Sequence, residues 1–138
     1  MSVRSFVDTN VAVYLFDADE PAKQQVAREV FESTDLQLVV STQVLGEFFV
    51  TVTRKLRRPL DAATAAEAVT ELARLPVVIV DVPLVGAAIE TSGRSQVSYW
   101  DALIVEAAAA AGCAQLLTED LAGGATIQGV RIENPFPG

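Results

Sequence analysis

The chain has 138 residues, of which 51% are hydrophobic and 20% charged, and this is the size and composition of one globular domain. It contains no histidine and a single cysteine, Cys113, which excludes histidine-based catalysis, histidine-ligated zinc, thiolate metal clusters and intramolecular disulfides. Ten Lys and Arg residues against 18 Asp and Glu give a formal net charge of −8, which by itself argues against a nucleic-acid partner.

Apolar runs alternate with segments of helical periodicity along the chain. Strands are predicted over residues 3–7, 36–40, 77–80, 114–117 and 130–132. Helices are predicted from about Asn10 to Phe16, from Pro21 to about Ser33, from Ser41 or Thr42 to Arg58, and over residues 61–75, 84–91 and 98–112. Strands separated by helices imply a parallel sheet covered on both faces. We therefore expect an α/β fold in a single domain that spans residues 1–138.

Four acidic residues occupy positions that such a sheet would bring to one edge: Asp8, Glu47, Asp101 and Asp120. Asp8 and Asp120 each follow an apolar run that is typical of a buried parallel strand, and ligand sites in open α/β sheets form outside the carboxyl ends of the strands. Carboxylates gathered there repel one another unless they share a cation, and their oxygens suit Mg²⁺ or Mn²⁺. Because histidine is absent, carboxylates are the chief catalytic groups that remain, and the set indicates metal-assisted hydrolysis.

Each of these carboxylates also has an ordinary structural interpretation. Asp8 is suited to be a helix N-cap, and Asp101 has the capping-box spacing to Ser98. Glu47 points away from the apolar side of its predicted helix, as a solvated helix residue would. Asp120 fits a turn, and its neighbour Glu119 is an alternative ligand because a loop can present either side chain. The four together carry more weight than any one of them.

A cluster of basic residues follows Glu47 on the same predicted helix, namely Arg54, Lys55, Arg57 and Arg58. On a helical wheel Arg54 and Arg58 fall on the side of Glu47, opposite the apolar stripe. They are therefore candidates to contact an RNA backbone. The alternative is that these cations only complement the dipole at the end of the helix, ahead of a proline.

Four segments, taken in order, resemble the motifs of the PIN-domain ribonucleases, and in particular the VapC-type toxins of bacterial toxin–antitoxin pairs. They are residues 6–11 around Asp8, 43–48 around Glu47, 99–108 around Asp101, and 116–121 with a Thr-x-Asp element. The resemblance covers essentially the full length. It implies a three-layer α/β/α sandwich with a central parallel sheet, a Mg²⁺- or Mn²⁺-dependent endoribonuclease activity, and inhibition by a cognate antitoxin.

By matching position, the resemblance implies that Asp8, Glu47, Asp101 and Asp120 form the acidic site. Asn10 and Thr118 would be supporting polar groups. One departure is that residues 121–124 contain no further acid, so a second metal ion would be loosely held or absent.

Two other interpretations remain. A phosphatase of the haloacid-dehalogenase type also begins with an aspartate after its first strand, but it requires a second aspartate where this chain has Asn10. The chain could instead be a non-catalytic domain that binds a metal or a partner through its acidic edge.

Partners and location are expected as follows. The resemblance implies an RNA substrate and an antitoxin protein, and the mean hydropathy of +0.35 suggests that nonpolar surface is covered by another chain, as in a homodimer. Val26, Val30 and Phe31, or Val50 and Leu56, are candidates for a homodimer face or an antitoxin groove. The amino terminus lacks the apolar segment of a secretory signal, so a cytoplasmic protein is expected.

Overall fold

The central sheet of the computed structural model, which describes residues 2–137, has six strands in the order β3-β2-β1-β4-β6-β5. The strands are β1 (Val3–Val7), β2 (Leu36–Ser41), β3 (Val77–Val78), β4 (Gln115–Leu117), β5 (Thr126–Ile127) and β6 (Val130–Glu133). Neighbouring strands from β3 to β6 pair in parallel, and β5 alone runs antiparallel to its neighbour. The predicted parallel sheet is thus confirmed for all strands but β5.

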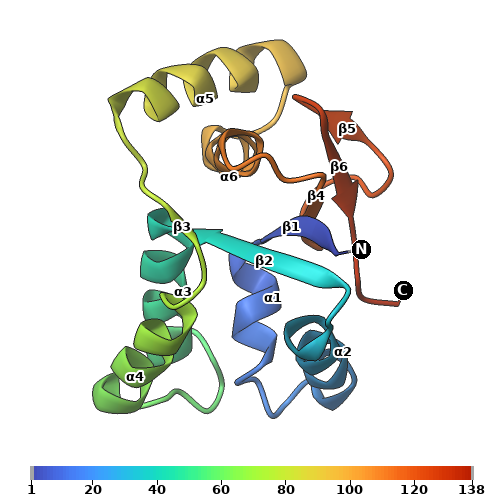
Figure 1. Cartoon of the computed structure of the whole chain (residues 1–138). Helices are drawn as coiled ribbons and strands as arrows, with labels where there is room; N and C mark the ends of the chain where they lie inside the picture. The colour runs from blue at the N-terminus through green and yellow to red at the C-terminus, as the bar shows by residue number, and fades with distance from the viewer. Residues whose placement is uncertain (1, 138) are drawn as a thin grey trace.

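Helices cover both faces of this sheet, as Figure 1 shows, with α1 to α4 on one side and α5 and α6 on the other. The helices are α1 (Thr9–Tyr14), α2 (Pro21–Glu32), α3 (Thr42–Arg54), α4 (Ala62–Leu72), α5 (Val82–Ser95) and α6 (Tyr99–Ala110). This arrangement confirms the three-layer sandwich. None of the helices in residues 2–137 has the length and apolarity needed to cross a membrane.

The main core lies where the three central strands meet α6. Phe6 of β1 pairs with Val39 on one side and with Leu116 on the other, and all three side chains are fully buried. Helix α6 is buried from Ala102 to Ala108, because it is apolar on nearly every side and packs between the sheet and α5. Cys113 is buried in the same cluster, and burial raises the pKa of its thiol.

A second core cluster lies between α1, α3 and α4. Phe48 and Val52 of α3 are fully buried there against Ala12 of α1 and Ala65 of α4. This packing fixes the rotation of α3 about its axis. Glu47, the residue next to Phe48, is therefore directed toward the end of β1 and is only partly buried.

The prediction that the third helix runs to Arg58 is wrong. Helix α3 ends at Arg54, Lys55 is its C-cap, and residues 55–58 form a turn. A residue before proline is disfavoured in the helical conformation, and here the N–H of Leu60 folds back to the carbonyl of Val52 at 2.8 Å. Arg58 thus leaves the helical face on which it was predicted and forms an ion pair with Asp19, at 3.2 Å.

Strand β5 was not predicted from the sequence. It forms a hairpin with β6 through Gln128 and Gly129, both with left-handed backbone angles (φ 51° and 77°). Such a two-residue turn matches the twist of a hairpin, but a strand of two residues is too short to show an alternating pattern. Smaller differences concern β3, which stops at Val78, and α5, which begins earlier than predicted because Asp81 caps its N-terminus.

Candidate active site

The four predicted carboxylates lie around the carboxyl ends of β1 and β4. Asp8 directly follows β1 and Thr118 directly follows β4, and the N–H of Asp8 donates to the carbonyl of Leu117 at 3.0 Å. The connections from β1 and β4 lead to opposite outer parts of the sheet, so the direction in which the chain adds strands switches between these two. This is the usual position of ligand sites in open α/β sheets.

Asp8 is both the N-cap of α1 and the most buried of the four carboxylates, with 6% of its surface exposed. One carboxylate oxygen accepts from the N–H of Thr9 and the other from Oγ1 of Thr118, each at 2.7 Å. Burial raises the pKa of Asp8 from 3.8 to about 6, and the negative charges of Asp120 and Glu47 add to this rise, although the two hydrogen bonds oppose it. The capping role and a place in the acidic site are therefore compatible.

Glu47 is held at the site by two hydrogen bonds. Its Oε1 accepts from Oγ1 of Thr9 at 2.7 Å, and its Oε2 accepts from Nε2 of Gln43 at 3.2 Å. Thr9 therefore touches Asp8 through its backbone and Glu47 through its side chain, which joins the start of α1 to α3. Neither Thr9 nor Gln43 was singled out from the sequence, although Gln43 stands four residues before Glu47 and so on the same helix face.

Asp101 enters the site from the first turn of α6. The hydroxyl of Ser98 caps this helix by accepting from the N–H of Asp101 at 3.0 Å, as the capping-box spacing predicted. Burial raises the pKa of the Asp101 carboxyl, and the charges of Asp120 and Glu47 raise it further. The same two neighbours thus act on Asp8 and on Asp101, which is consistent with the four carboxylates lying near one another.

Thr118 is the centre of the polar contacts behind these carboxylates. It is fully buried, and its hydroxyl donates to Asp8 while accepting from Nδ2 of Asn10 at 3.3 Å and from the N–H of Asp120 at 3.0 Å. One hydroxyl thus positions a carboxylate from each of two strand ends. The supporting roles predicted for Asn10 and Thr118 are consistent with these contacts.

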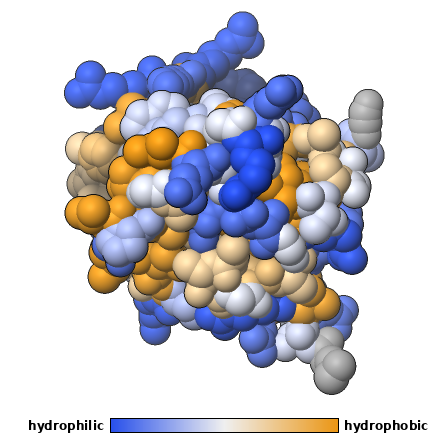
Figure 2. All heavy atoms as spheres, turned by 90° about the horizontal axis from the view of Figure 1, so that it is seen from above, coloured by the Kyte–Doolittle hydropathy of each residue, from blue (hydrophilic) through white to orange (hydrophobic). Residues whose placement is uncertain are grey.

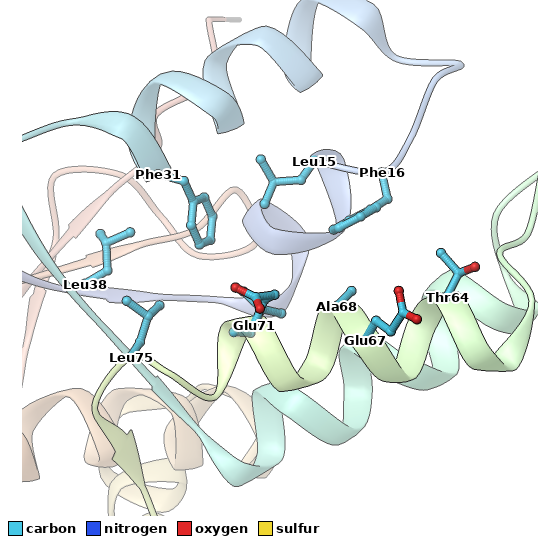
Figure 3. A pocket seen from close by; sticks show the side chains of 10 residues that line it. Leu15, Phe16, Phe31, Leu38, Thr64, Glu67, Ala68, Glu71 and Leu75 are labelled. Atoms are coloured by element: carbon cyan, nitrogen blue, oxygen red, sulfur yellow. The ribbon is translucent and has the colours of Figure 1, made fainter.

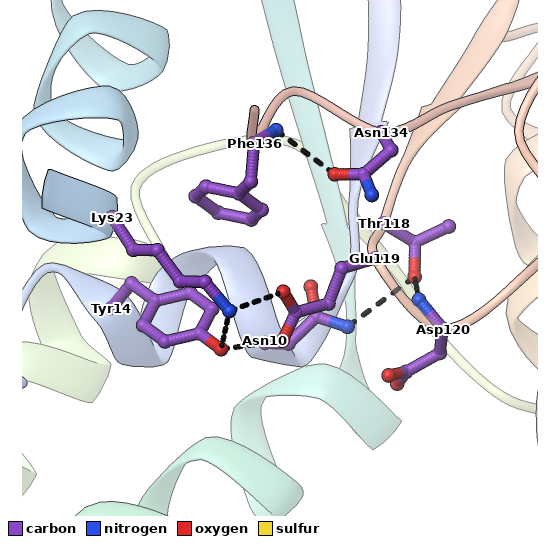
Figure 4. A network of polar contacts seen from close by, with 8 residues as sticks. All are labelled: Asn10, Tyr14, Lys23, Thr118, Glu119, Asp120, Asn134 and Phe136. Carbon is purple, nitrogen blue, oxygen red and sulfur yellow. Dashed lines mark hydrogen bonds and ion pairs between the residues drawn. The ribbon is translucent and has the colours of Figure 1, made fainter. Parts of the chain in front are cut away.

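Glu119 belongs to a separate network, which Figure 4 shows. Its carboxylate accepts from the hydroxyl of Tyr14 and pairs with Nζ of Lys23 at 3.1 Å, and Lys23 also contacts the Tyr14 hydroxyl at 3.1 Å. The hydrogen bonds that Lys23 donates to Tyr14 and Glu119 raise the pKa of Lys23, and burial raises the pKa of Tyr14. Because its carboxylate is occupied in this way, Glu119 does not share the position of Asp120.

The donor set fits a hard divalent cation by its chemistry. Neighbouring carboxylates repel one another and gain from a shared cation, and the amide oxygens of Asn10 and Gln43 are buried at this edge with no hydrogen-bond partner. Within residues 2–137, however, no three of the side chains that ligate metals are close enough together to hold an ion as they stand. The side chains would therefore have to draw together around a bound cation.

A groove of about 510 Å³ lies beside Glu47, on the side of α3. It is lined by Thr9, Gly46, Glu47, Val50, Thr51 and Lys55. It leads from the acidic edge to the end of α3, where Arg54 and Lys55 are both exposed. Lys55 lines this groove together with Glu47, whereas Arg58 pairs with Asp19.

A separate apolar pocket of about 430 Å³ lies on the face of the sheet covered by α1 to α4 (Figure 3). Leu15 and Phe16, which follow α1, form one wall, and Phe31 of α2 and Leu38 of β2 continue it. The opposite wall is α4, whose lining residues include Glu67 and Glu71. The pocket therefore combines an apolar floor with acidic side chains.

Comparison with known proteins bears on the family and the fold. Residues 5–122 match the PIN domain. A toxin–antitoxin complex from Klebsiella pneumoniae has a chain with a TM-score of 0.72 and 17% identity, covering 96% of this chain and 98% of that one. Among curated proteins, none matches the chain.

Two further solved structures have the same fold. VapC20 from Mycobacterium tuberculosis, described as a toxin that cleaves the sarcin–ricin loop, gives a TM-score of 0.66 at 23% identity, covering 81% of this chain and 86% of that one. VapBC2 from Rickettsia felis, solved with a DNA fragment from its promoter, gives 0.66 at 17% identity, covering 96% and 98%. At these identities the likeness is one of fold.

Proposed function

The chain belongs to the PIN domain family, and from this premise we propose that it is a divalent-metal-dependent endoribonuclease that acts as the toxin of a toxin–antitoxin pair. The observation that carries the proposal is the hydrogen-bonded arrangement at one edge of the sheet, in which Thr9 joins Asp8 to Glu47 and Thr118 joins Asp8 to Asp120, with Asp101 beside them. In a chain without histidine, such a set is suited to hydrolysis of phosphodiester bonds. The solved toxins of the same fold support the assignment.

In this proposal Asp8 and Asp101 are the primary ligands of a Mg²⁺ or Mn²⁺ ion, and Asp120 completes the site directly or through water. When bound, the ion supplies a lowered pKa for the attacking water and positive charge beside the phosphate. Glu47 is a ligand or the general base, and its hydrogen bonds with Thr9 and Gln43 hold it in one orientation. Asn10 and Thr118 keep the carboxylates of the two strand ends in place.

The test is cleavage of RNA by the purified protein with Mg²⁺ or Mn²⁺, compared with the same reaction in EDTA. Asp8→Asn and Asp101→Asn are each expected to abolish the metal-dependent cleavage, since each removes a charge while it preserves side-chain shape. Asp35→Asn is the matched control and should cleave RNA at the wild-type rate, because Asp35 lies in an exposed turn at the amino-terminal end of β2, away from the acidic edge. Wild-type rates in either active-site variant would overturn the assignment.

The proposed partner is an antitoxin that seats an amphipathic helix in the apolar pocket. The apolar face of this helix would contact residues such as Phe16 and Phe31, and basic residues of the helix would pair with Glu67 and Glu71, which also line the pocket. Phe31, which the sequence offered as a residue of a homodimer face or an antitoxin groove, lines this pocket. Co-expression of the adjacent small gene should restore growth and yield a co-purifying complex, and Phe31→Ala should weaken that complex. A protein that is harmless alone and binds no such product would contradict the toxin assignment.

A homodimer and a cytoplasmic location complete the proposal. Val50 of α3 is exposed, as are Val82 and Ile89 of α5, and Figure 2 shows apolar patches between polar residues on the face seen from above. Exposed apolar residues of this kind suit contact with a second copy. Light scattering of the purified protein measures the oligomeric state, and a monomer at all concentrations would contradict the dimer.

A second candidate function is a non-catalytic PIN domain that binds a partner through the acidic edge. The observation that favours it is that the carboxylates, as they stand in residues 2–137, do not close around an ion. RNA left intact at every divalent metal concentration, together with partner binding that Asp8→Asn abolishes, would support this alternative over the nuclease.

A further inference from the structure

Trp100 is the only tryptophan of the chain and stands immediately before Asp101. Its surface is 62% exposed, although indole is among the side chains that gain most from burial. The Tyr99 ring packs against it edge to face, with ring centroids 4.9 Å apart and an interplanar angle of 75°. The indole is thus supported on one side by a ring that packs on the core, while most of its surface is open to water.

The backbone of Trp100 is fixed to the acidic edge. Nε2 of Gln43 donates to the Trp100 carbonyl at 3.3 Å and to Oε2 of Glu47 at 3.2 Å. One amide group therefore joins the residue that carries the exposed indole to a carboxylate of the site. The cap formed by Ser98 fixes the same turn from the other side. The backbone of Trp100 is consequently anchored at the rim of the site.

The groove beside Glu47 continues from this rim along α3. Gln43 contacts Trp100 in the first turn of α3, Glu47 follows one turn later, and Lys55 caps the other end. At 1.5 Å per residue the path from Gln43 to Lys55 is ~18 Å long. Gly46 lines the groove with open space where a side chain would stand. The residue that carries the exposed ring thus lies against the first turn of α3, Glu47 follows on the helix, and the two cations lie at its end.

We propose that Trp100 is a base-stacking platform for a nucleotide of single-stranded RNA, which crosses the acidic edge and follows the groove to Lys55 and Arg54. Proteins bind single strands by combining aromatic platforms with cations that track the backbone, and along α3 Glu47 lies between the turn that contacts Trp100 and the two cations. The inference rests on the proposed nuclease function, since the strand must cross those carboxylates. A site for an RNA duplex would not need an exposed ring at this position.

The single tryptophan makes the contact directly measurable. Intrinsic fluorescence of the wild-type protein is titrated with a short unlabelled single-stranded RNA in EDTA, so that the strand is bound without being cut. A base stacked on the indole is expected to quench the fluorescence in a saturable way. RNA that carries an abasic position at each site in turn should lose the quenching at one of them.

Variants give the second readout, with affinity measured by the anisotropy of labelled RNA in EDTA. Trp100→Leu is expected to weaken binding about tenfold, while Trp100→Phe keeps most of the affinity because it keeps an aromatic face. The matched control is Val3→Ala, at the amino-terminal end of β1 and 39% exposed, which should bind as the wild type does. Unchanged affinity in Trp100→Leu, or fluorescence that RNA does not alter, would overturn the proposal.

Trp100 emission per mole of protein that changes with protein concentration but not with added RNA would place Trp100 in a contact between copies of the chain, which also overturns the proposal. The nuclease assignment is tested separately, by metal-dependent cleavage in the wild type and its loss in Asp8→Asn. A wild type that cleaves RNA while Trp100→Leu cleaves it with the same KM would refute only the stacking role. Quenching by RNA without cleavage would refute only the nuclease.

Discussion

Replacing Asp8 with asparagine is expected to stabilise the metal-free protein increasingly as the pH rises. The Asp8 carboxyl is buried beside other acidic groups, and its pKa is raised from 3.8 to about 6. A shift of about 2 pH units corresponds to ~3 kcal/mol between the two protonation states. Because the pKa of Asp8 is higher in the folded state than in the unfolded state, the protonated carboxyl stabilises the fold. This stabilisation is fully present below the unfolded pKa and is lost as the pH rises through about 6.

The measurable part of this effect depends on the pH values chosen. The sequence pI is about 4.4, so solubility restricts the assay to higher pH. Between about pH 5 and about pH 8 the titration of Asp8 should lower the free energy of unfolding of the wild type by ~1.4 kcal/mol. Asparagine cannot ionise, so the difference between variant and wild type should grow by this amount.

A second, constant effect accompanies the change. The side-chain oxygen of asparagine can still accept from the N–H of Thr9, but its NH₂ group cannot accept from the hydroxyl of Thr118. That loss costs about 1 kcal/mol and is the same at both pH values. The sign of the stability difference at one pH is therefore not diagnostic, whereas its change with pH is.

The assay is urea denaturation followed by circular dichroism, in EDTA, at both pH values. Asp35→Asn is the control, because Asp35 lies in an exposed turn at the amino-terminal end of β2, and its difference from the wild type should be equal at both pH values. Addition of Mg²⁺ at the higher pH should stabilise the wild type more than Asp8→Asn. A difference for Asp8→Asn that does not change with pH would refute the argument that its ionised form is costly in the fold.

Three further predictions concern the polar contacts and the basic residues. Thr118→Val removes the hydroxyl that Asp8, Asn10 and Asp120 share and should lower the free energy of unfolding by about 2 kcal/mol, whereas Thr70→Val, on the exposed face of α4, should lower it far less in the same urea assay. Lys23→Met leaves the Glu119 carboxylate without its cation and should lower the melting temperature measured by calorimetry; an unchanged value would show that this network does not stabilise the fold. Arg54→Ala should reduce the slope of the logarithm of the RNA-binding constant against the logarithm of the salt concentration by about one unit. Arg58→Ala should change this slope less, because Arg58 is paired with Asp19 outside the helix. Equal effects of the two variants would contradict this distinction.

The parts of the site that could be predicted depend on local sequence. Asp8 and Thr118 end apolar runs, and a parallel sheet necessarily brings such ends to one edge. Asp101 was predictable because the Ser98 capping box sets the start of α6. Glu47 followed from the apolar stripe of α3, which fixes the opposite side of the helix. In each case one local pattern determined where the side chain lies.

The remaining parts depend on how distant elements pack together. The bond between Thr9 and Glu47 joins residues 38 apart in the sequence, and the pair of Lys23 with Glu119 joins residues 96 apart. No local pattern specifies such pairs. The turn that ends α3 was missed for a different reason, since the basic residues before Pro59 are compatible with a helix until the backbone folds back onto Val52.

Helix α1 connects the two places where the proposed partner would act. Asp8 caps its beginning, and Leu15 and Phe16, just after its end, line the apolar pocket. The helix has six residues and is therefore ~9 Å long, a distance that about three extended residues can span. A partner helix seated in the pocket would thus need only a short following segment to reach the carboxylates. Because a cationic side chain from that segment and a divalent ion would neutralise the same charges, the proposed partner can restrain the site by replacing the metal without covering the groove beside Glu47.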